Sequence, residues 1–163
     1  MTTSYLPTDR RVLLIPIDDS EDAEKSVSWT LQNLCRPGGD DLLYFLHVVP
    51  ERQFDVIGGD AAETIVDEDE DAERRAVDHA KNFIKHRILE KLEDKKVPHQ
   101  VEIVRFRTDT ESVGTVISER AATLNAAAVV MAKHRQGAIR AFFIGSATNF
   151  VANHCKQPVV VLH

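Results

Sequence analysis

The stretch AAAVVMAKHRQGAIRAFFIGS, residues 126–146, decides the fold of this chain. It opens on a short apolar run typical of a strand that is buried on both faces. A basic loop follows, and after Gly145-Ser146 the sequence predicts a short helix over residues 148–154 and a buried strand over residues 158–162. Strand, loop, helix and strand form one βαβ unit. Its loop lies where such sheets bind ligands, beyond the carboxyl ends of the strands.

The glycine and serine at the start of this last helix favour an anion. The first N–H groups of a helix have no partner within the helix, and the helix dipole adds partial positive charge at the same end. Gly145-Ser146 therefore marks a candidate anion site.

The rest of the chain is expected to complete a sheet around this unit. Further strands are predicted at residues 12–17, 42–49 and 101–106. Between them, apolar residues recur at helical spacing, which predicts helices over residues 23–34, 76–92 and 113–124. Alternating strands and helices indicate an α/β fold with right-handed crossovers. We expect one doubly wound domain over residues 1–163, with a five-stranded parallel sheet in the order 3-2-1-4-5 and helices on both faces.

Two segments depart from this regular pattern. Residues 101–106 alternate between apolar and polar side chains, which predicts an edge strand with one solvated face. Residues 51–71 contain Gly58-Gly59 and the acidic run 67–71, and they predict a long, solvated and mobile connection. A connection of this length is uncommon, so it is interpreted either as a loop leading into a helix or as a lid. Its acidic end suits the N-terminus of the helix that follows.

Composition limits the partners. Twenty basic and twenty-six acidic residues give a net charge of −6, which disfavours a general binder of nucleic acid or of anionic membranes. No apolar stretch reaches the roughly 18 residues that span a bilayer. The first residues lack the apolar core of a signal peptide, and Cys35 and Cys155 fit no metal or redox spacing. We expect a cytoplasmic protein with no membrane, nucleic-acid or metal partner.

Asp18 follows the first predicted strand, and two roles remain open for it. It could contact a ligand near the switch point of the sheet, across the crevice from the loop at 132–146. It could equally cap the helix that follows. The pair Asp18-Asp19 is also similar to the acidic pair of phospho-accepting receiver domains. That alternative is disfavoured because Asp109 falls in a helix cap instead of directly after a strand.

No catalytic constellation stands out. The chain has seven histidines, and none pairs with a serine or cysteine in a recognisable nucleophile motif. His47 lies within a strand, where a hydrogen-bonded core histidine is expected. His79 and His86 are expected to face outward, and no carboxylate or cysteine stands at the companion positions that a metal site needs. The sequence therefore predicts a protein that is not an enzyme.

Three stretches carry a resemblance to a known family. They are IPIDDSE (15–21), LHVVP (46–50) and the C-terminal block with its Gly145-Ser146 and Pro-Val-Val-Val strand. From about Arg11 to Leu162 the chain resembles a universal stress protein. The resemblance implies an adenine nucleotide alpha hydrolase-like fold. It also implies an adenine and ribose site near Pro16, Asp18, Val48 and Met131, and a phosphate site at Gly145, Ser146 and Ala147.

The family's phosphate signature, G-x-x-G-x9-G-[ST], is kept in part. Gly145-Ser146 matches its end, while Ala132 and Arg135 stand where its first two glycines belong. In nucleotide-binding members those glycines let the backbone approach the phosphates. Arg135 would block the loop, replace lost N–H donors with its guanidinium, or simply lie on the surface.

Three functions follow from the resemblance. The first is a stress-response protein that binds ATP or AMP. The second is a nucleotide-free dimeric interaction or chaperone-like module of the same fold. The third, an ATP-using enzyme, has the least support because no additional catalytic residues are present. We also predict a homodimer through Val159–Leu162, because a short, uncharged apolar edge strand is normally paired or blunted.

Overall fold

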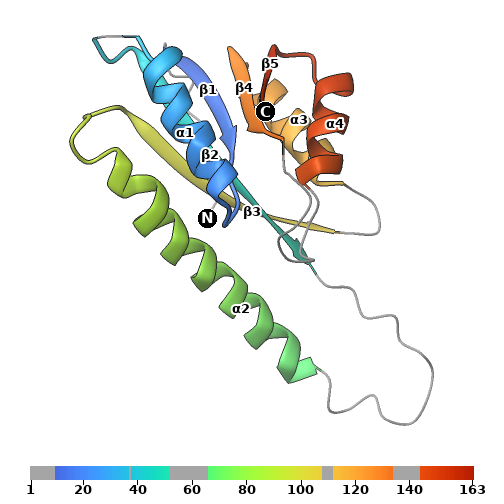
Figure 1. Cartoon of the computed structure of the whole chain (residues 1–163). Coiled ribbons are helices and arrows are strands. Elements are labelled where there is room, and N and C mark those ends of the chain that lie inside the picture. The colour runs from blue at the N-terminus through green and yellow to red at the C-terminus, as the bar shows by residue number, and fades with distance from the viewer. Residues whose placement is uncertain (1–9, 37, 52–65, 108–111, 134–143) are drawn as a thin grey trace.

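The computed structural model describes residues 10–36, 38–51, 66–107, 112–133 and 144–163 (Figure 1). Strands and helices alternate along this part of the chain. In order they are β1 (Arg11–Pro16), α1 (Glu21–Asn33), β2 (Asp41–Glu51), α2 (Val66–Phe83), the π-helix η1 (Ile84–Ile88), the 3₁₀ helix η2 (Leu89–Lys91), β3 (His99–Arg107), α3 (Val113–Thr123), β4 (Ala128–Ala132), α4 (Ile144–His154) and β5 (Val159–Leu162). None of the helices in these ranges is long and apolar enough to cross a membrane.

The five strands form one sheet in the order β3-β2-β1-β4-β5, and every pair is parallel. The predicted fold is therefore confirmed. Two buried clusters fill the two faces of the sheet: α1, α2 and η1 pack on one face, and α3 and α4 pack on the other. β1 contributes to both, because successive side chains of a strand point to opposite faces. Leu13 and Ile15 lie under α1 and α2, and Leu14 lies under α3 and α4.

The sheet opens between β1 and β4. β1 pairs with β2 from Arg11 to Pro16. Its pairing with β4 is shorter: Leu13 is opposite Ala128, and Leu14 is opposite Val129. Pro16 has no N–H to donate to a ladder. The chain also leaves β1 and β4 towards opposite faces of the sheet, since α1 and α4 belong to different clusters. This is the topological switch point of a doubly wound sheet, where a crevice is expected.

The helix before β3 differs from its prediction at its start. Residues 67–71, expected at the end of the connection, lie in the first turns of α2. Ala76, expected on the apolar stripe, is exposed, because the first half of α2 extends past the end of the sheet (Figure 1). The rest of the stripe is confirmed as buried: Ala80, Phe83, Ile84, Ile88 and Leu92. Residues 52–65 of the connection lie outside the described residues.

β3 lies at the edge of the sheet, as predicted, but its polar face is not solvated. Glu102, with a side chain 17% exposed, accepts hydrogen bonds from the Tyr44 hydroxyl and from Arg120 of α3, both at 2.8 Å. α3 thus covers the face that alternation assigned to water. It begins after Ser112, whose hydroxyl accepts the Thr115 N–H at 3.1 Å. The cap expected at residues 108–110 lies outside the described residues.

α4 begins four residues earlier than predicted, at Ile144 instead of residue 148. It packs closely on α3 at Gly114, where an added Cβ would lie 2.7 Å from the Phe150 ring. The absence of a side chain at Gly114 therefore sets how near the two helices approach. This packing brings the first turn of α4 to the same edge of the sheet as the opening between β1 and β4.

Candidate functional site

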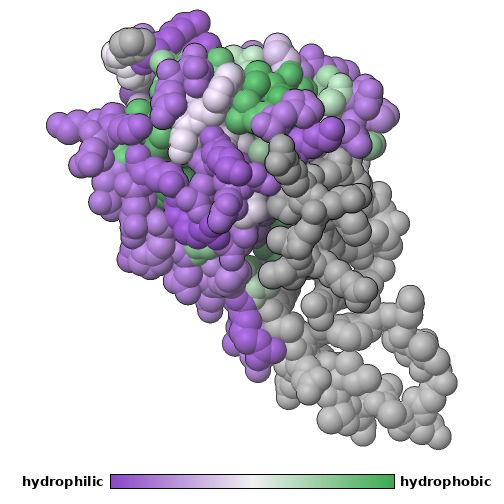
Figure 2. All heavy atoms as spheres, viewed as in Figure 1, coloured by the Kyte–Doolittle hydropathy of each residue, from purple (hydrophilic) through white to green (hydrophobic). Residues whose placement is uncertain are grey.

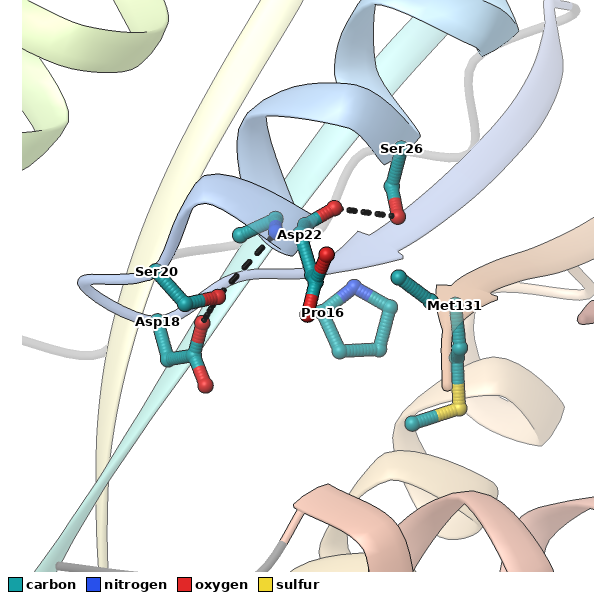
Figure 3. Close-up of a pocket in the computed structure, with 8 residues that line it drawn as sticks. Pro16, Asp18, Ser20, Asp22, Ser26 and Met131 are labelled. Atoms are coloured by element: carbon teal, nitrogen blue, oxygen red, sulfur yellow. Dashed lines mark hydrogen bonds between the residues drawn. The ribbon is translucent and has the colours of Figure 1, made fainter. Parts of the chain in front are cut away.

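A shallow hollow opens at the carboxyl ends of β1 and β4 (Figure 3). The two strands supply one wall, and the first turns of α1 supply the other. We call it the switch-point pocket. It is lined by Pro16, Asp18, Ser20, Asp22, Ala23, Ser26, Met131 and Ala132.

Ser20, not Asp18, caps α1. Ser20 has the extended backbone of a cap residue, and its Oγ accepts the Ala23 N–H at 3.1 Å. The Ser20 hydroxyl in turn donates to Asp18 Oδ1. Of the two roles open for Asp18, the structure assigns the capping to its neighbour. Asp18 holds the cap hydroxyl in place while its carboxylate faces the switch-point pocket (Figure 3).

Sequence reasoning missed the α1 wall of the pocket. Ser20, Ala23 and Ser26 are spaced three apart and so lie along one side of the helix. Ser26 is only 1% exposed, and its hydroxyl donates to the Asp22 carbonyl at 3.1 Å. The signal was available in the sequence: Ser26 is a small polar residue next to Val27, on the face of the helix that is otherwise apolar.

The pocket brings four predicted site residues together: Pro16, Asp18, Met131 and Ala132. Met131 lines the pocket from β4, and its buried side chain also belongs to the cluster under α3 and α4 (Figure 3). Val48, predicted beside them, does not line the pocket and packs instead with the cluster under α3 and α4. Its strand is one place further from the opening than β1.

The predicted phosphate residues lie at the start of α4. Gly145 and Ser146 belong to its first turn, and Ala147 is 3% exposed. The Thr148 hydroxyl donates to the Ala132 carbonyl at 3.4 Å, which ties the start of α4 to the end of β4. The pocket and the helix start therefore adjoin through Ala132. Arg135 lies outside the described residues.

The two parts of the site, the pocket and the start of α4, carry opposite charge. The pocket wall carries two carboxylates, Asp18 and Asp22, with serine oxygens beside them. The start of α4 carries the N–H groups and the positive end of the helix dipole. The first end suits hydroxyl and amino donors, and the second suits an anion. A ligand with donors at one end and negative charge at the other matches both.

His47 supports the pocket from behind. Its Nδ1–H donates to the Ile17 carbonyl at 2.8 Å, and it stacks edge-on against Phe83. Burial lowers the pKa of His47 below its ordinary value, although the bond to Ile17 and the charges of Asp18 and Asp19 act in the opposite direction. The ring is therefore neutral near pH 7, and the predicted hydrogen-bonded core histidine is confirmed. His79 and His86 are exposed, also as predicted.

A comparison with models of protein families identifies the family of this chain. The model of the universal stress protein family matches residues 10–163. The chain belongs to the universal stress protein family. This confirms the resemblance seen in the three stretches of sequence. No curated protein matches the chain.

Solved structures of the same fold include universal stress proteins. The hypothetical protein MJ0577 is 23% identical with a TM-score of 0.69, covering 93% of this chain and 94% of its own. An Arabidopsis thaliana universal stress protein family protein, solved with AMP bound, is 15% identical with a TM-score of 0.61, covering 93% and 90%. The universal stress protein from Archaeoglobus fulgidus, solved with dAMP, is 17% identical with a TM-score of 0.50, covering 94% and 98%.

Proposed function

We propose that this universal stress protein binds an adenine nucleotide, ATP or AMP, across the switch-point pocket and the start of α4. The observation that carries the proposal is the junction at Ala132. Ala132 lines the pocket together with Asp18 and Met131. Its carbonyl also accepts a hydrogen bond from Thr148 of α4. The structures of the Arabidopsis and Archaeoglobus proteins with AMP and dAMP support the same ligand class.

The charges determine which way the nucleotide lies. A phosphate in the pocket would face the carboxylates of Asp18 and Asp22, and like charges at such distances repel. Phosphate therefore belongs at the start of α4, and the neutral base or ribose belongs in the pocket.

The proposed role is binding without catalysis, in the cytoplasm. The residues that line the pocket include no histidine, cysteine or lysine. Its one hydroxyl next to a carboxylate, that of Ser20, is already committed to the α1 cap through Ala23. Such a wall recognises a ligand, but it offers no base–nucleophile pair for attack on a phosphate.

Titration calorimetry with ATP, AMP and adenosine tests the nucleotide proposal, using wild type and Arg135→Gly. We expect micromolar to millimolar binding, with ATP preferred over adenosine. If Arg135 contacts phosphate, its replacement weakens ATP binding by about 1.5–3 kcal/mol, the range of a charge-assisted hydrogen bond. If it obstructs the loop, replacement strengthens binding. No binding of any of the three ligands at millimolar concentration would instead favour the nucleotide-free module.

We also propose a homodimer through β5. This strand is at the edge of the sheet, pairs with β4 on one side, and consists of four apolar residues that are each partly exposed. Figure 2 shows apolar atoms gathered on the viewed face where β4 and β5 lie beside α1. Light scattering at micromolar concentration should give twice the mass of the chain. Val160→Lys should halve it, and a monomeric wild type would refute the proposal.

A further inference from the structure

The turn between β1 and α1, residues 17–20, contacts the pocket on one side and other elements of the fold on the other. Pro16, Asp18 and Ser20 line the switch-point pocket. The residues between them are held from the other side: Ile17 by β2 and Asp19 by α2 and η1. Ile17 accepts from the His47 ring at 2.8 Å, donates its N–H to the Leu46 carbonyl at 2.9 Å, and is 3% exposed. The position of each pocket residue therefore depends on neighbours that never face the pocket.

Asp19 is held less firmly than Ile17. Unlike Ile17 it is exposed, so packing does not fix it. Its carboxylate is held by two side chains from the other helical segment. Arg87 donates to Oδ1, and His79 Nε2 lies 2.9 Å from Oδ2.

Arg87 also contacts α1. Its guanidinium donates to Glu24 Oε1 at 2.5 Å, so one side chain connects the turn before α1 with the first turns of α1. Lys91 approaches the other oxygen of Glu24 at 3.0 Å and, among the described residues, forms no ion pair with Asp19. Arg87 belongs to η1, a π-helical turn inserted between α2 and η2. Such turns are frequent at functional sites because they redirect side chains relative to a regular helix.

We propose that Arg87 is a positioning residue for the switch-point pocket. By holding Asp19 and Glu24 together, it fixes the turn from which Asp18 and Ser20 face the ligand. The proposal rests on the proposed nucleotide function for its affinity readout. It adds that a side chain of η1, outside the pocket lining, sets the geometry of the site.

Lys91 supplies a matched control. It is on the same segment, carries the same charge, contacts the same Glu24 and has the same side-chain exposure of 36%. We expect Arg87→Ala to weaken AMP binding about fivefold by calorimetry, the equivalent of a strong exposed ion pair, and Lys91→Ala to leave it within about twofold. Asp19→Ala should weaken binding as Arg87→Ala does, and the double variant should be no weaker than either single one. Equal affinities for the Arg87 and Lys91 variants would overturn the proposal.

A second measurement needs no ligand. The Ala23 N–H bonds to Ser20 Oγ, so its hydrogen exchange reports how well the turn is held. Exchange at Ala23 should be faster in Arg87→Ala than in wild type and unchanged in Lys91→Ala. If wild type binds no nucleotide, the proposed function fails, and the exchange comparison alone decides the positioning role. Unchanged exchange in Arg87→Ala would refute it.

Discussion

The two ends of β1 use charge in opposite ways. At the amino end, Arg11 donates from Nε and Nη2 to the two oxygens of Asp41 at 2.8 and 2.9 Å. Asp41 also accepts the Arg36 N–H at 2.7 Å, and its side chain is 2% exposed. At the carboxyl end, Asp18 and Asp22 line an open hollow without an arginine or lysine in its wall.

We infer from this difference that the charges at the amino end serve the fold, and we propose that those at the carboxyl end contact a ligand. A buried carboxylate is tolerated when several donors surround it, and removing a donor or acceptor then leaves a desolvated charge. The carboxylates in the pocket wall have protein donors as well, Ser20 for Asp18 and Lys25 for Asp22, but they are less buried than Asp41. We therefore expect substitutions at the amino end to change stability, and substitutions at the carboxyl end to change binding.

The largest expected effect is at the amino end. Asp41→Ala should lower the free energy of unfolding by about 3 kcal/mol, because it removes both bonds from Arg11, which keeps only its bond to the Leu34 carbonyl, and leaves the Arg36 N–H without its acceptor. The value is at the low end for a broken buried pair, since the Arg11 side chain is 27% exposed. Urea denaturation measures it. Asp22→Ala is the matched control and should cost less than about 1 kcal/mol, because its partner Lys25 is an exposed side chain. Equal losses would contradict the comparison.

The second effect is on binding. Asp18→Ala should weaken AMP binding by about 1.5–3 kcal/mol, roughly ten- to 150-fold, if its carboxylate accepts a ligand hydroxyl or amine. Asp18→Asn should lose less, since an amide still offers one acceptor. Calorimetry on both variants, with Asp41→Asn as the control for the other end, tests this. An Asp41→Asn protein that folds but binds as weakly as Asp18→Ala would show that the two ends are not separate.

The third and smallest effect is the pH dependence of stability. Burial lowers the pKa of His47, so the unfolded chain takes up a proton first as the pH falls below about 6.5. Stability should therefore decline from about pH 6.5 and level off at the lower folded-state value. Hydrogen bonding from Arg11 holds the pKa of Asp41 below its ordinary value despite burial. Its contribution is complete above about pH 4 and is lost as the pH falls through the folded-state value.

Two variants distinguish the loss of stability caused by His47 from the loss caused by Asp41. Urea titrations from pH 3 to 8 should show that His47→Gln removes the decline that begins near pH 6.5 and leaves the acid phase. Asp41→Asn should remove part of the phase below about pH 4 and leave the first one. A single phase common to both variants would show that the two ends do not titrate independently.

The sheet was predictable from sequence because its signals are local. β1, β2 and β4 are continuous apolar runs, and the segments between them have helical spacing, so burial on two faces follows from pattern alone. The solvated face assigned to β3 was wrong because Glu102 is covered by Arg120, a residue 18 positions away on another element. Periodicity within one strand carries no information about such a neighbour.

The site was predictable in part for the same reason. Pro16, Asp18, Met131 and Ala132 lie at or just beyond the carboxyl ends of β1 and β4, so the topology alone places them together. Ser20, Asp22 and Ser26 were missed because their place in the pocket depends on how α1 is rotated against β4. Arg87 was missed because a π-turn cannot be recognised from residue spacing.

The most direct test of the account is a backbone amide NMR titration with AMP. If AMP binds across the switch-point pocket and the start of α4, shifts should map to Asp18–Ala23, to Met131–Lys133 and to the start of α4, including Gly145 and Ser146. The amides of Arg11, Arg36 and Asp41 should stay unchanged at the other end of the same sheet. Shifts centred on the Arg11–Asp41 end, or no shift at millimolar AMP, would contradict the account.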